Sequence, residues 1–300
     1  MEQHCQACGE LEFSPLPYYY LWKNKEFNLV KCRNCGLICQ MPKPTPEDLN
    51  ELYSDDYFDH GHHGLEERQI TYEQLKDAMP VGQLQDRIRN TVLRAHPNAR
   101  SLFEIGAALG HLLHAAQQMG MTVSGLEISD AANKRAKEKF GFDLYKGDFE
   151  TMDLSAEYNQ WDAIYGGDVF EHFLHPGIVV DKIYDMLKPG GVAVLVVPST
   201  FNLFSTSVAT RLLQLSGKRR KLADNPYHIH EFTTATARRI MERKFQKITI
   251  YNDIKSPSEM NLKDGSLAYR IKFLFHLINY PFTKITGRNG DRVTIIAIKD

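Results

Sequence analysis

The chain has no cysteine after Cys39, no excess of charge of either sign and no long apolar run. Its 300 residues hold 36 Lys and Arg against 37 Asp and Glu, so the formal net charge of -1 gives no reason to expect DNA as a partner. No apolar stretch reaches the ~20 residues that a bilayer-spanning helix needs. The first residues lack the basic and apolar regions of a signal peptide, so we expect a cytoplasmic protein.

All five cysteines lie within the first 39 residues, and four of them form two Cys-x-x-Cys pairs. Cys5, Cys8, Cys32 and Cys35 have the spacing of a structural zinc site, because two such pairs can close a tetrahedral shell of thiolates. A closed shell leaves no open position for a substrate. Two disulfides are the alternative, which the missing export signal disfavours. Cys39 is predicted to be a spare, partly buried thiol.

Segments with strand and helix character alternate from Arg100 onward. Residues 102–105 are a predicted strand, and a Gly-rich turn, a helix and a second strand that ends at Glu127 follow. Such alternation indicates a parallel sheet with helices on both faces, which binds ligands at the carboxyl ends of its strands. The predicted fold class is α/β: a Rossmann-like, seven-stranded, mostly parallel sheet with a small N-terminal zinc ribbon.

The turn after the strand at residues 102–105 indicates which adenosine-containing cofactor such a sheet would bind. A nicotinamide-binding loop needs G-x-G-x-x-G, but from Gly106 onward the required glycines fall on alanine and histidine. Instead, Glu104, Gly106, Ala108 and Gly110 form E-x-G-x-A-x-G. This pattern resembles the first motif of the class I S-adenosylmethionine-dependent methyltransferases, with one glycine replaced by alanine.

Further segments resemble motifs of the same family. Residues 147–149, Gly-Asp-Phe, resemble the motif that binds the adenine, and residues 161–172 resemble the fourth-strand motif, whose end lies beside the transferable methyl. Residues 187–191, Leu-Lys-Pro-Gly-Gly, resemble the turn into the fifth strand. The resemblance implies S-adenosylmethionine as cofactor. It implies cofactor contacts from Glu104, Gly106, Ala108, Gly110, Glu127, Ile128, Asp148, Phe149 and Asp168, with Glu127 binding the ribose hydroxyls.

The pair Glu171-His172 is the candidate for proton transfer. An ordinary imidazole has a pKa of about 6.5 and is largely neutral at cytoplasmic pH, so it can take a proton from the molecule that receives the methyl group, the acceptor. The pair also resembles the general base of sugar methyltransferases that carry an N-terminal zinc domain. We expect His172 to be the base and Glu171 to orient it. The alternative is that His172 only packs and hydrogen-bonds at a helix start.

A second cluster, Tyr227-His-Ile-His-Glu-Phe-Thr233, precedes a predicted helix. The resemblance implies that His228 or His230 contacts the acceptor. Asp168-x-x-Glu171-His172 with the later His230 also loosely resembles the divalent-metal site of small-RNA 3′-end methyltransferases. Tyr57 lies in a polar and aromatic loop that we expect to form either a lid over the acceptor or an exposed surface loop.

The predicted domains are residues 1–45, the zinc ribbon; 46–98, a linker and helical lid; and 99–300, the methyltransferase domain. This last domain contains inserts near residues 201–230 and 252–290. The apolar run at 269–280 is expected to pack in the core, and the basic run at 218–221 to be a solvated face. Covering an acceptor pocket, a dimer contact and a peripheral membrane contact are the alternatives for these inserts.

The predicted function is methyl transfer to a sugar, free or nucleotide-linked, or to a related small metabolite. One alternative is an O-methyltransferase of a quinone or lipid-like acceptor. The other is a zinc-ribbon RNA-binding methyltransferase with a divalent metal at Asp168, Glu171, His172 and His230. The near-neutral charge disfavours RNA as a partner.

Overall fold

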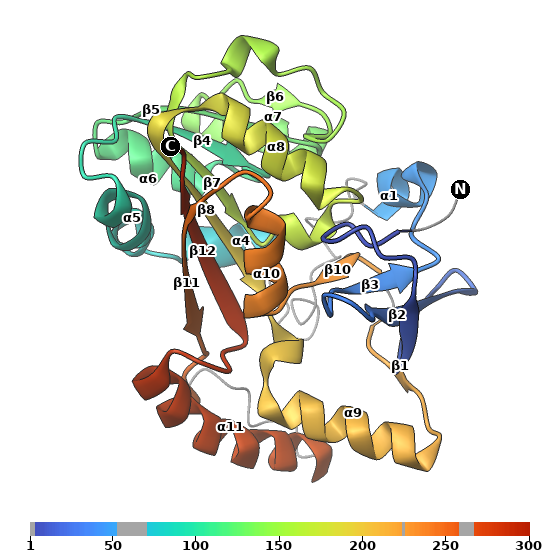
Figure 1. Cartoon of the computed structure of the whole chain (residues 1–300). Helices are drawn as coiled ribbons and strands as arrows, with labels where there is room; N and C mark the ends of the chain where they lie inside the picture. The colour runs from blue at the N-terminus through green and yellow to red at the C-terminus, as the bar shows by residue number, and fades with distance from the viewer. Residues whose placement is uncertain (1–3, 53–70, 224–225, 258–266) are drawn as a thin grey trace.

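The computed structural model of the protein describes residues 4–52, 71–223, 226–257 and 267–300. The described residues form a seven-stranded sheet and a five-stranded sheet (Figure 1). The predicted lid loop with Tyr57 lies outside the described residues.

The seven-stranded sheet confirms the predicted Rossmann-like architecture. Its strands, in spatial order, are β11 (Lys247–Asp253), β12 (Arg292–Ile298), β8 (Leu187–Pro198), β7 (Trp161–Gly167), β4 (Ser101–Ile105), β5 (Thr122–Glu127) and β6 (Tyr145–Lys146). Strands β4 to β8 pair in parallel, whereas β12 is antiparallel to both of its neighbours. The strand order reverses between β4 and β7, and ligands of such sheets bind outside the carboxyl ends at this point.

Both faces of this sheet are buried, and β8 illustrates how. Val192, Val194 and Val196 pack into one apolar cluster, whereas the residues between them pack into another. Helices α5 (Val81–Ile88) and α6 (His111–Gln118) contribute to the first cluster, and α8 (Pro176–Met186) and α10 (Thr234–Met241) to the second. A strand that is buried on both faces needs a continuous apolar run, which explains the sequence of β8.

The remaining helices follow local sequence signals. Helix α7 (Asp130–Phe140) follows β5, and the Ser129 hydroxyl caps it by accepting the Ala132 N–H. A capping box of Thr71 and Gln74 starts α4 (Tyr72–Asp77). Shorter elements are α1 (Pro46–Leu52), η1 (Arg89–Leu93), η2 (Ser155–Glu157), η3 (Phe170–His172) and η4 (Thr200–Asn202).

The five-stranded sheet is the N-terminal ribbon together with two short strands from late in the chain. The ribbon strands β1 (Phe13–Trp22), β2 (Lys25–Cys32) and β3 (Ile38–Met41) are antiparallel. Strand β9 (Arg220–Lys221) pairs with β1, and β10 (His230–Glu231) pairs with β3. The insert that the sequence placed in the methyltransferase domain therefore supplies both outer strands of the ribbon sheet.

Helices α9 (Phe204–Ser216) and α11 (Leu267–Thr286) lie together along the lower edge of Figure 1. The expectation that residues 269–280 pack in the core is wrong, because Leu274 and Ile278 of α11 are 60% and 72% exposed. Hydrophobic periodicity identifies an apolar helix face but not the direction in which that face points. Among the described residues, no helix is both long and apolar enough to cross a bilayer.

Candidate active site

The loop between β4 and α6 lies at the carboxyl edge of the sheet and has a strained backbone. Gly106 and Gly110 have φ of 67° and 79°, and Ala108 adopts φ of 47°, where a Cβ atom is disfavoured. A Cβ at Gly106 would lie 2.9 Å from Cγ2 of Val169, which follows β7. Gly106 is therefore needed both for the turn and for the close approach of β7.

Glu127 ends β5 and faces this loop. Its Oε2 accepts the Ala108 N–H at 2.8 Å, and its Oε1 accepts the Ser129 N–H at 2.9 Å. Burial raises the pKa of Glu127, and these backbone donors offset part of that effect. Each carboxylate oxygen can accept two hydrogen bonds, so both oxygens retain capacity for ligand hydroxyls.

Glu104 lies in β4, next to the loop, and is 7% exposed. Its Oε2 is buried and has no hydrogen-bond partner among the described residues. Burial raises the pKa of Glu104 to about 8, although the Lys76 ammonium lowers it. A buried carboxyl oxygen without a partner is costly unless a ligand completes it. A cationic ligand such as the sulfonium and amino groups of S-adenosylmethionine fits this position.

Helix α4 covers the loop of residues 106–110 between β4 and α6, which we name the donor loop. Tyr72, at its first position, packs against the apolar cluster of Leu109 and Ala132 together with Ala108. Burial lowers the pKa of Lys76, whereas the nearby Asp168 and Glu104 raise it. The sequence placed a helical lid at residues 46–98 but did not single out Tyr72 or Lys76. The capping box at Thr71 is the signal from which the start of this helix could have been found.

Asp148 and Phe149 follow β6 at the same edge of the sheet. The Asp148 Oδ1 accepts the Glu150 N–H at 2.9 Å, which holds the turn after β6. Phe149 is 1% exposed and belongs to the core cluster of the sheet. Ile128, between Glu127 and Ser129, is 38% exposed. The Asp148 carboxylate is therefore partly exposed at the carboxyl edge of the sheet, whereas the Phe149 ring is buried in the core.

Asp168 follows β7 and is held by an arginine from β12. The Arg292 Nη1 lies 2.6 Å from the Asp168 Oδ1. Asp168 has φ of 53°, so the backbone turns sharply there. This turn is followed directly by η3, which carries Glu171 and His172.

Glu171, His172 and His228 form a compact cluster. The Glu171 Oε1 lies 3.5 Å from the His172 Nε2 and 3.9 Å from the His228 Nε2. The two imidazole rings are nearly perpendicular, with centroids 5.2 Å apart. Glu171 is 1% exposed, and neither of its carboxyl oxygens has a hydrogen-bond partner among the described residues. Both histidines thus face this buried carboxylate.

The segment before α10 connects this cluster to the ribbon. The His228 Nδ1 lies 3.4 Å from the Glu231 Oε1, and Tyr20 of β1 hydrogen-bonds Glu231. Burial lowers the pKa of His228, but the carboxylates of Glu231 and Glu171 outweigh this effect and raise the pKa to about 9. His228 is therefore a cation at neutral pH, and the ribbon contributes to its environment.

His230 lies apart from this cluster. It is 1% exposed, and its Nε2 lies 3.5 Å from the Leu174 carbonyl. Burial and the nearby Lys43 lower the pKa of His230 to about 3, so it is neutral. The predicted metal set included His230 and Asp168, but the described residues do not bring these two to Glu171 and His172. The carboxylate and histidines that lie within 4.8 Å of one another are Glu171, His172 and His228.

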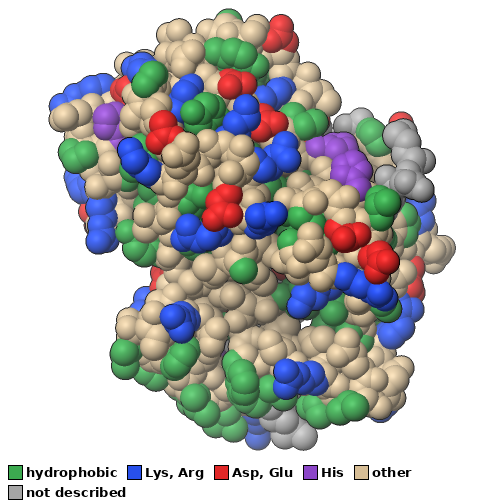
Figure 2. Space-filling model, viewed as in Figure 1, with side chains coloured by type: hydrophobic (Ala, Val, Ile, Leu, Met, Phe, Trp, Pro, Cys, Tyr) green, Lys and Arg blue, Asp and Glu red, His purple; other side chains and the backbone are tan. Residues whose placement is uncertain are grey.

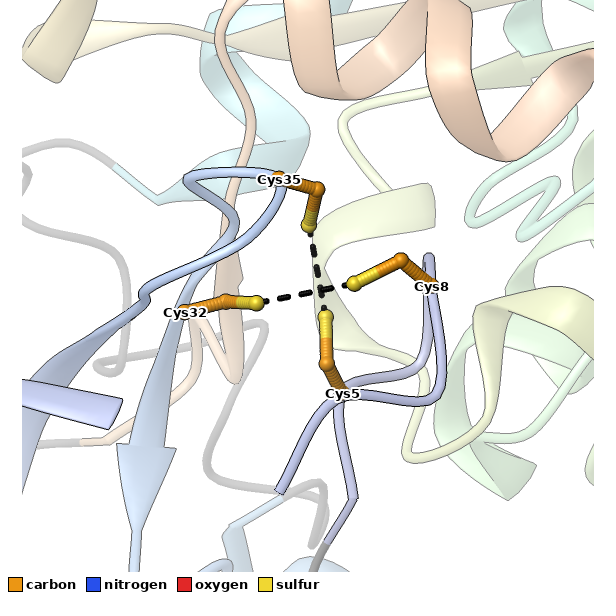
Figure 3. A group of neighbouring side chains, drawn as sticks. All are labelled: Cys5, Cys8, Cys32 and Cys35. Carbon is orange, nitrogen blue, oxygen red and sulfur yellow. Dashed lines mark hydrogen bonds between the residues drawn. The ribbon is translucent and has the colours of Figure 1, made fainter. Parts of the chain in front are cut away.

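The four N-terminal thiols converge on one point (Figure 3). The Sγ atoms of Cys5 and Cys35 are 3.4 Å apart, those of Cys8 and Cys32 are 3.6 Å apart, and all four lie within 4.8 Å of one another. A tetrahedral zinc site with Zn–S bonds of ~2.3 Å requires sulfurs about 3.8 Å apart, so the cluster fits zinc. Cys39 stands outside it as a buried thiol, and burial raises its pKa to about 12.

Solved structures share the fold of the large sheet. A SAM-dependent methyltransferase of Archaeoglobus fulgidus is 17% identical, and the match covers 76% of this chain and 99% of that one with a TM-score of 0.50. A SAM-dependent methyltransferase of Thermotoga maritima is 16% identical, with 76% and 95% covered and a TM-score of 0.49. Phosphoethanolamine N-methyltransferase 2 of Haemonchus contortus is 16% identical, with 84% and 56% covered and a TM-score of 0.48.

The comparison with protein families agrees with the donor loop and the sheet. No curated protein matches the sequence. Residues 81–244, more than half of the chain, match the family described as the methyltransferase domain. This match spans β4 to β8 and the helices between them, including Glu104, Glu127 and Glu171. The chain therefore belongs to the methyltransferase-domain family and is an S-adenosylmethionine-dependent methyltransferase.

Proposed function

We propose that the protein transfers a methyl group to a small, hydroxyl-rich acceptor, a sugar in free or nucleotide-linked form or a related metabolite. The observation that carries this proposal is the cluster of Glu171, His172 and His228 at the carboxyl end of β7. Glu171 and His172 follow Val169, which packs against Gly106 of the β4–α6 loop. A cluster of charged and imidazole groups suits a polar acceptor, because buried polar groups bind hydroxyls well and apolar surfaces poorly.

The donor residues have complementary roles in this proposal. Bound S-adenosylmethionine supplies a methyl group that its sulfonium already activates. Glu127 accepts the ribose hydroxyls, and Glu104 faces the positive end of the cofactor. Asp148 binds the adenine, and the buried Phe149 ring supports this position from the core instead of contacting the adenine as the sequence predicted. The loop from Gly106 to Gly110 approaches the ligand through its backbone, and Asp168 and Ile128 border the site.

The proton moves to His172. A ring nitrogen of His172 accepts the proton of the acceptor hydroxyl, and the buried Glu171 carboxylate, 3.5 Å from Nε2, stabilises the resulting imidazolium. His228 is a cation that donates to the acceptor or compensates the charge of Glu171. His230 is excluded from this role because it is neutral and bonded to a backbone carbonyl in the core.

The experiment that tests the acceptor class measures S-adenosylhomocysteine formation with nucleotide sugars, free sugars, quinones and short RNAs. Turnover with a sugar and no turnover with the others is the expected result. The exposed apolar side chains of α9 and α11 favour a lipid-like acceptor as the second candidate, which turnover with a quinone would support. Turnover confined to RNA and lost with EDTA, while the ribbon keeps its metal, would instead indicate a divalent cation at Glu171, His172 and His228.

Glu104 predicts a pH-dependent cofactor affinity. Its pKa is raised to about 8 in the free protein, so it is mostly protonated at pH 7 and must release a proton to face a cationic cofactor. The affinity for S-adenosylmethionine is expected to rise by up to about ten-fold per pH unit as pH approaches 8. The folding stability of the free protein has the opposite pH dependence. The raised pKa of Glu104 contributes most to stability below the unfolded pKa of about 4.3, and this contribution is lost as pH rises through about 8.

Calorimetry in two buffers with different ionisation enthalpies measures this proton release. The Glu104→Gln variant provides the control, since an amide has the same shape but no proton to lose. The variant is expected to bind with an affinity that no longer varies with pH. An equal pH dependence in both proteins would assign the titration to another group.

The ribbon cysteines are proposed to hold one structural zinc ion. Cys5, Cys8, Cys32 and Cys35 supply four thiolates, which close the shell and leave no coordination position for an acceptor. The metal then maintains the ribbon sheet, and through β10 it maintains the segment that carries His228.

A further inference from the structure

Helix α11 presents an apolar stripe to solvent. Leu274, Leu277, Ile278, Phe282 and Ile285 are between 43% and 84% exposed. Their spacing places them on one face of the helix. An ordinary surface helix turns such a face toward the core, so the stripe on α11 is exposed where burial is the norm.

The opposite face of α11 is polar and fixed to the protein. The His276 Nε2 lies 2.7 Å from the Lys255 carbonyl, and the Asn279 Nδ2 and Thr283 Oγ1 both donate to the Asn289 carbonyl. His276 and Thr283 are 8% and 1% exposed. The hydrogen bonds of the buried face therefore set the rotation of the helix and direct its apolar stripe outward.

Helix α9 extends the same surface. Phe204, Leu212 and Leu215 are 60%, 61% and 87% exposed, and their spacing of eight and three residues also places them on one face. The two helices contact each other, and apolar and basic side chains lie along the lower edge of the space-filling view (Figure 2). Together they form an exposed apolar surface, which in a folded protein marks an interaction site.

The segments that contain the two helices carry charge of one sign. Residues 203–222 and 267–290 contain nine Lys and Arg and no Asp or Glu, whereas the chain as a whole has a net charge of -1. Arg211, Arg220, Arg270 and Arg288 are exposed. Two of the cations are paired with acids of other elements, Arg219 with Glu26 and Lys284 with Asp253. The surface thus combines apolar side chains with an excess of positive charge.

From this combination we propose that the apolar stripes of α9 and α11 form a membrane-docking face, which rests on the surface of an anionic lipid bilayer. Apolar side chains flanked by Lys and Arg suit the boundary between acyl chains and negative headgroups. A second copy of the chain is a poorer occupant, because a symmetric dimer through this face would set two cationic surfaces against each other. Neither helix spans the bilayer; both lie in its interface.

Flotation of the full chain with vesicles tests the proposal, and it measures binding without any turnover. Vesicles of phosphatidylcholine are compared with vesicles that contain about 30% phosphatidylglycerol, whose negative surface attracts basic groups. The protein is expected to bind the anionic vesicles at least about ten-fold more strongly, and this preference is expected to shrink in about 0.5 M NaCl.

The matched variant is Leu215→Gln, Ile278→Gln and Ile285→Gln together. These side chains are 87%, 72% and 84% exposed, so the fold should tolerate the changes. The triple variant is expected to bind anionic vesicles at least about ten-fold more weakly, because it loses most of the apolar area that enters the interface. Ile178→Gln, at 44% exposure on α8, is the control and should bind normally.

Two results would overturn the membrane assignment. The first is wild-type protein that does not float with anionic vesicles, or a triple variant that floats equally well. The second is sedimentation velocity that finds a wild-type dimer and a monomeric triple variant, which would assign the face to a second copy of the chain. Neither result depends on an acceptor. A failed membrane assignment would therefore leave the proposed sugar methylation unaffected, and the turnover panel tests that proposal separately.

Discussion

Replacing His172 by alanine is expected to lower kcat by about 10²–10⁴-fold and to leave the Kd for S-adenosylmethionine unchanged. Alanine removes the group that is proposed to accept the proton of the acceptor. The donor residues Glu104 and Glu127 lie on β4 and β5, whereas His172 lies in η3 after β7. The variant should therefore still bind the cofactor, and the loss should fall on the chemical step.

Turnover with the acceptor that the panel identifies, together with calorimetric binding of the cofactor, measures both quantities. His175→Ala is the matched control, because His175 lies three positions later, is half exposed and pairs with Glu150. It should keep nearly full activity. Wild-type turnover in His172→Ala would remove the proposed base, and lost turnover together with lost cofactor affinity would indicate a structural role for His172.

The second large effect is expected from loss of the ribbon metal. Replacing Cys32 by serine should release the zinc, unfold the ribbon and abolish methyl transfer, although no cysteine takes part in the chemistry. Structural zinc contributes on the order of 10 kcal/mol to small zinc domains, and Cys5 and Cys32 also belong to the main apolar cluster of the methyltransferase sheet. Unfolding the ribbon therefore removes part of that core and frees the strand β10.

Metal analysis, thermal unfolding and turnover of the same preparations check this prediction. The wild-type chain should carry about one zinc ion, and Cys32→Ser should carry far less, unfold at lower temperature and be inactive. Cys39→Ala, a buried cysteine outside the cluster, should keep its zinc. A chelated protein with normal activity and an unchanged Tm would contradict the structural assignment.

The loop and the strand ends that are proposed to bind the donor were predictable as structure from the sequence, because they depend on short-range patterns. The strand, the turn from Gly106 and the acid at Glu127 lie close together in the chain, and the fold brings Glu127 onto the Ala108 N–H. The convergence of the four cysteines was equally predictable, since the spacing within each pair determines the geometry of a knuckle. In both cases local sequence carries the information that the site needs.

The acceptor half was less predictable because it depends on contacts between distant segments. His228 and His230 would share a face in a regular strand, but the Ile229 N–H donates to the Tyr227 carbonyl, and this tight turn separates them. Two-residue strands such as β10 carry no periodic pattern at all. The outward direction of the apolar face of α11 depends likewise on hydrogen bonds to Lys255 and Asn289, which no helical pattern contains.

The composition of the ribbon sheet affects how the protein is made. Strands β1 to β3 leave the ribosome first, but β9 and β10, which cover their two edges, come from the last third of the chain. Gln40 donates to the His228 carbonyl across 188 positions of sequence. Contacts of such high sequence separation form late, so the nascent ribbon keeps two open strand edges while strands β4 to β8 of the large sheet are synthesised. An N-terminal fragment that stops before residue 220 would retain both edges and the tendency to aggregate that they bring.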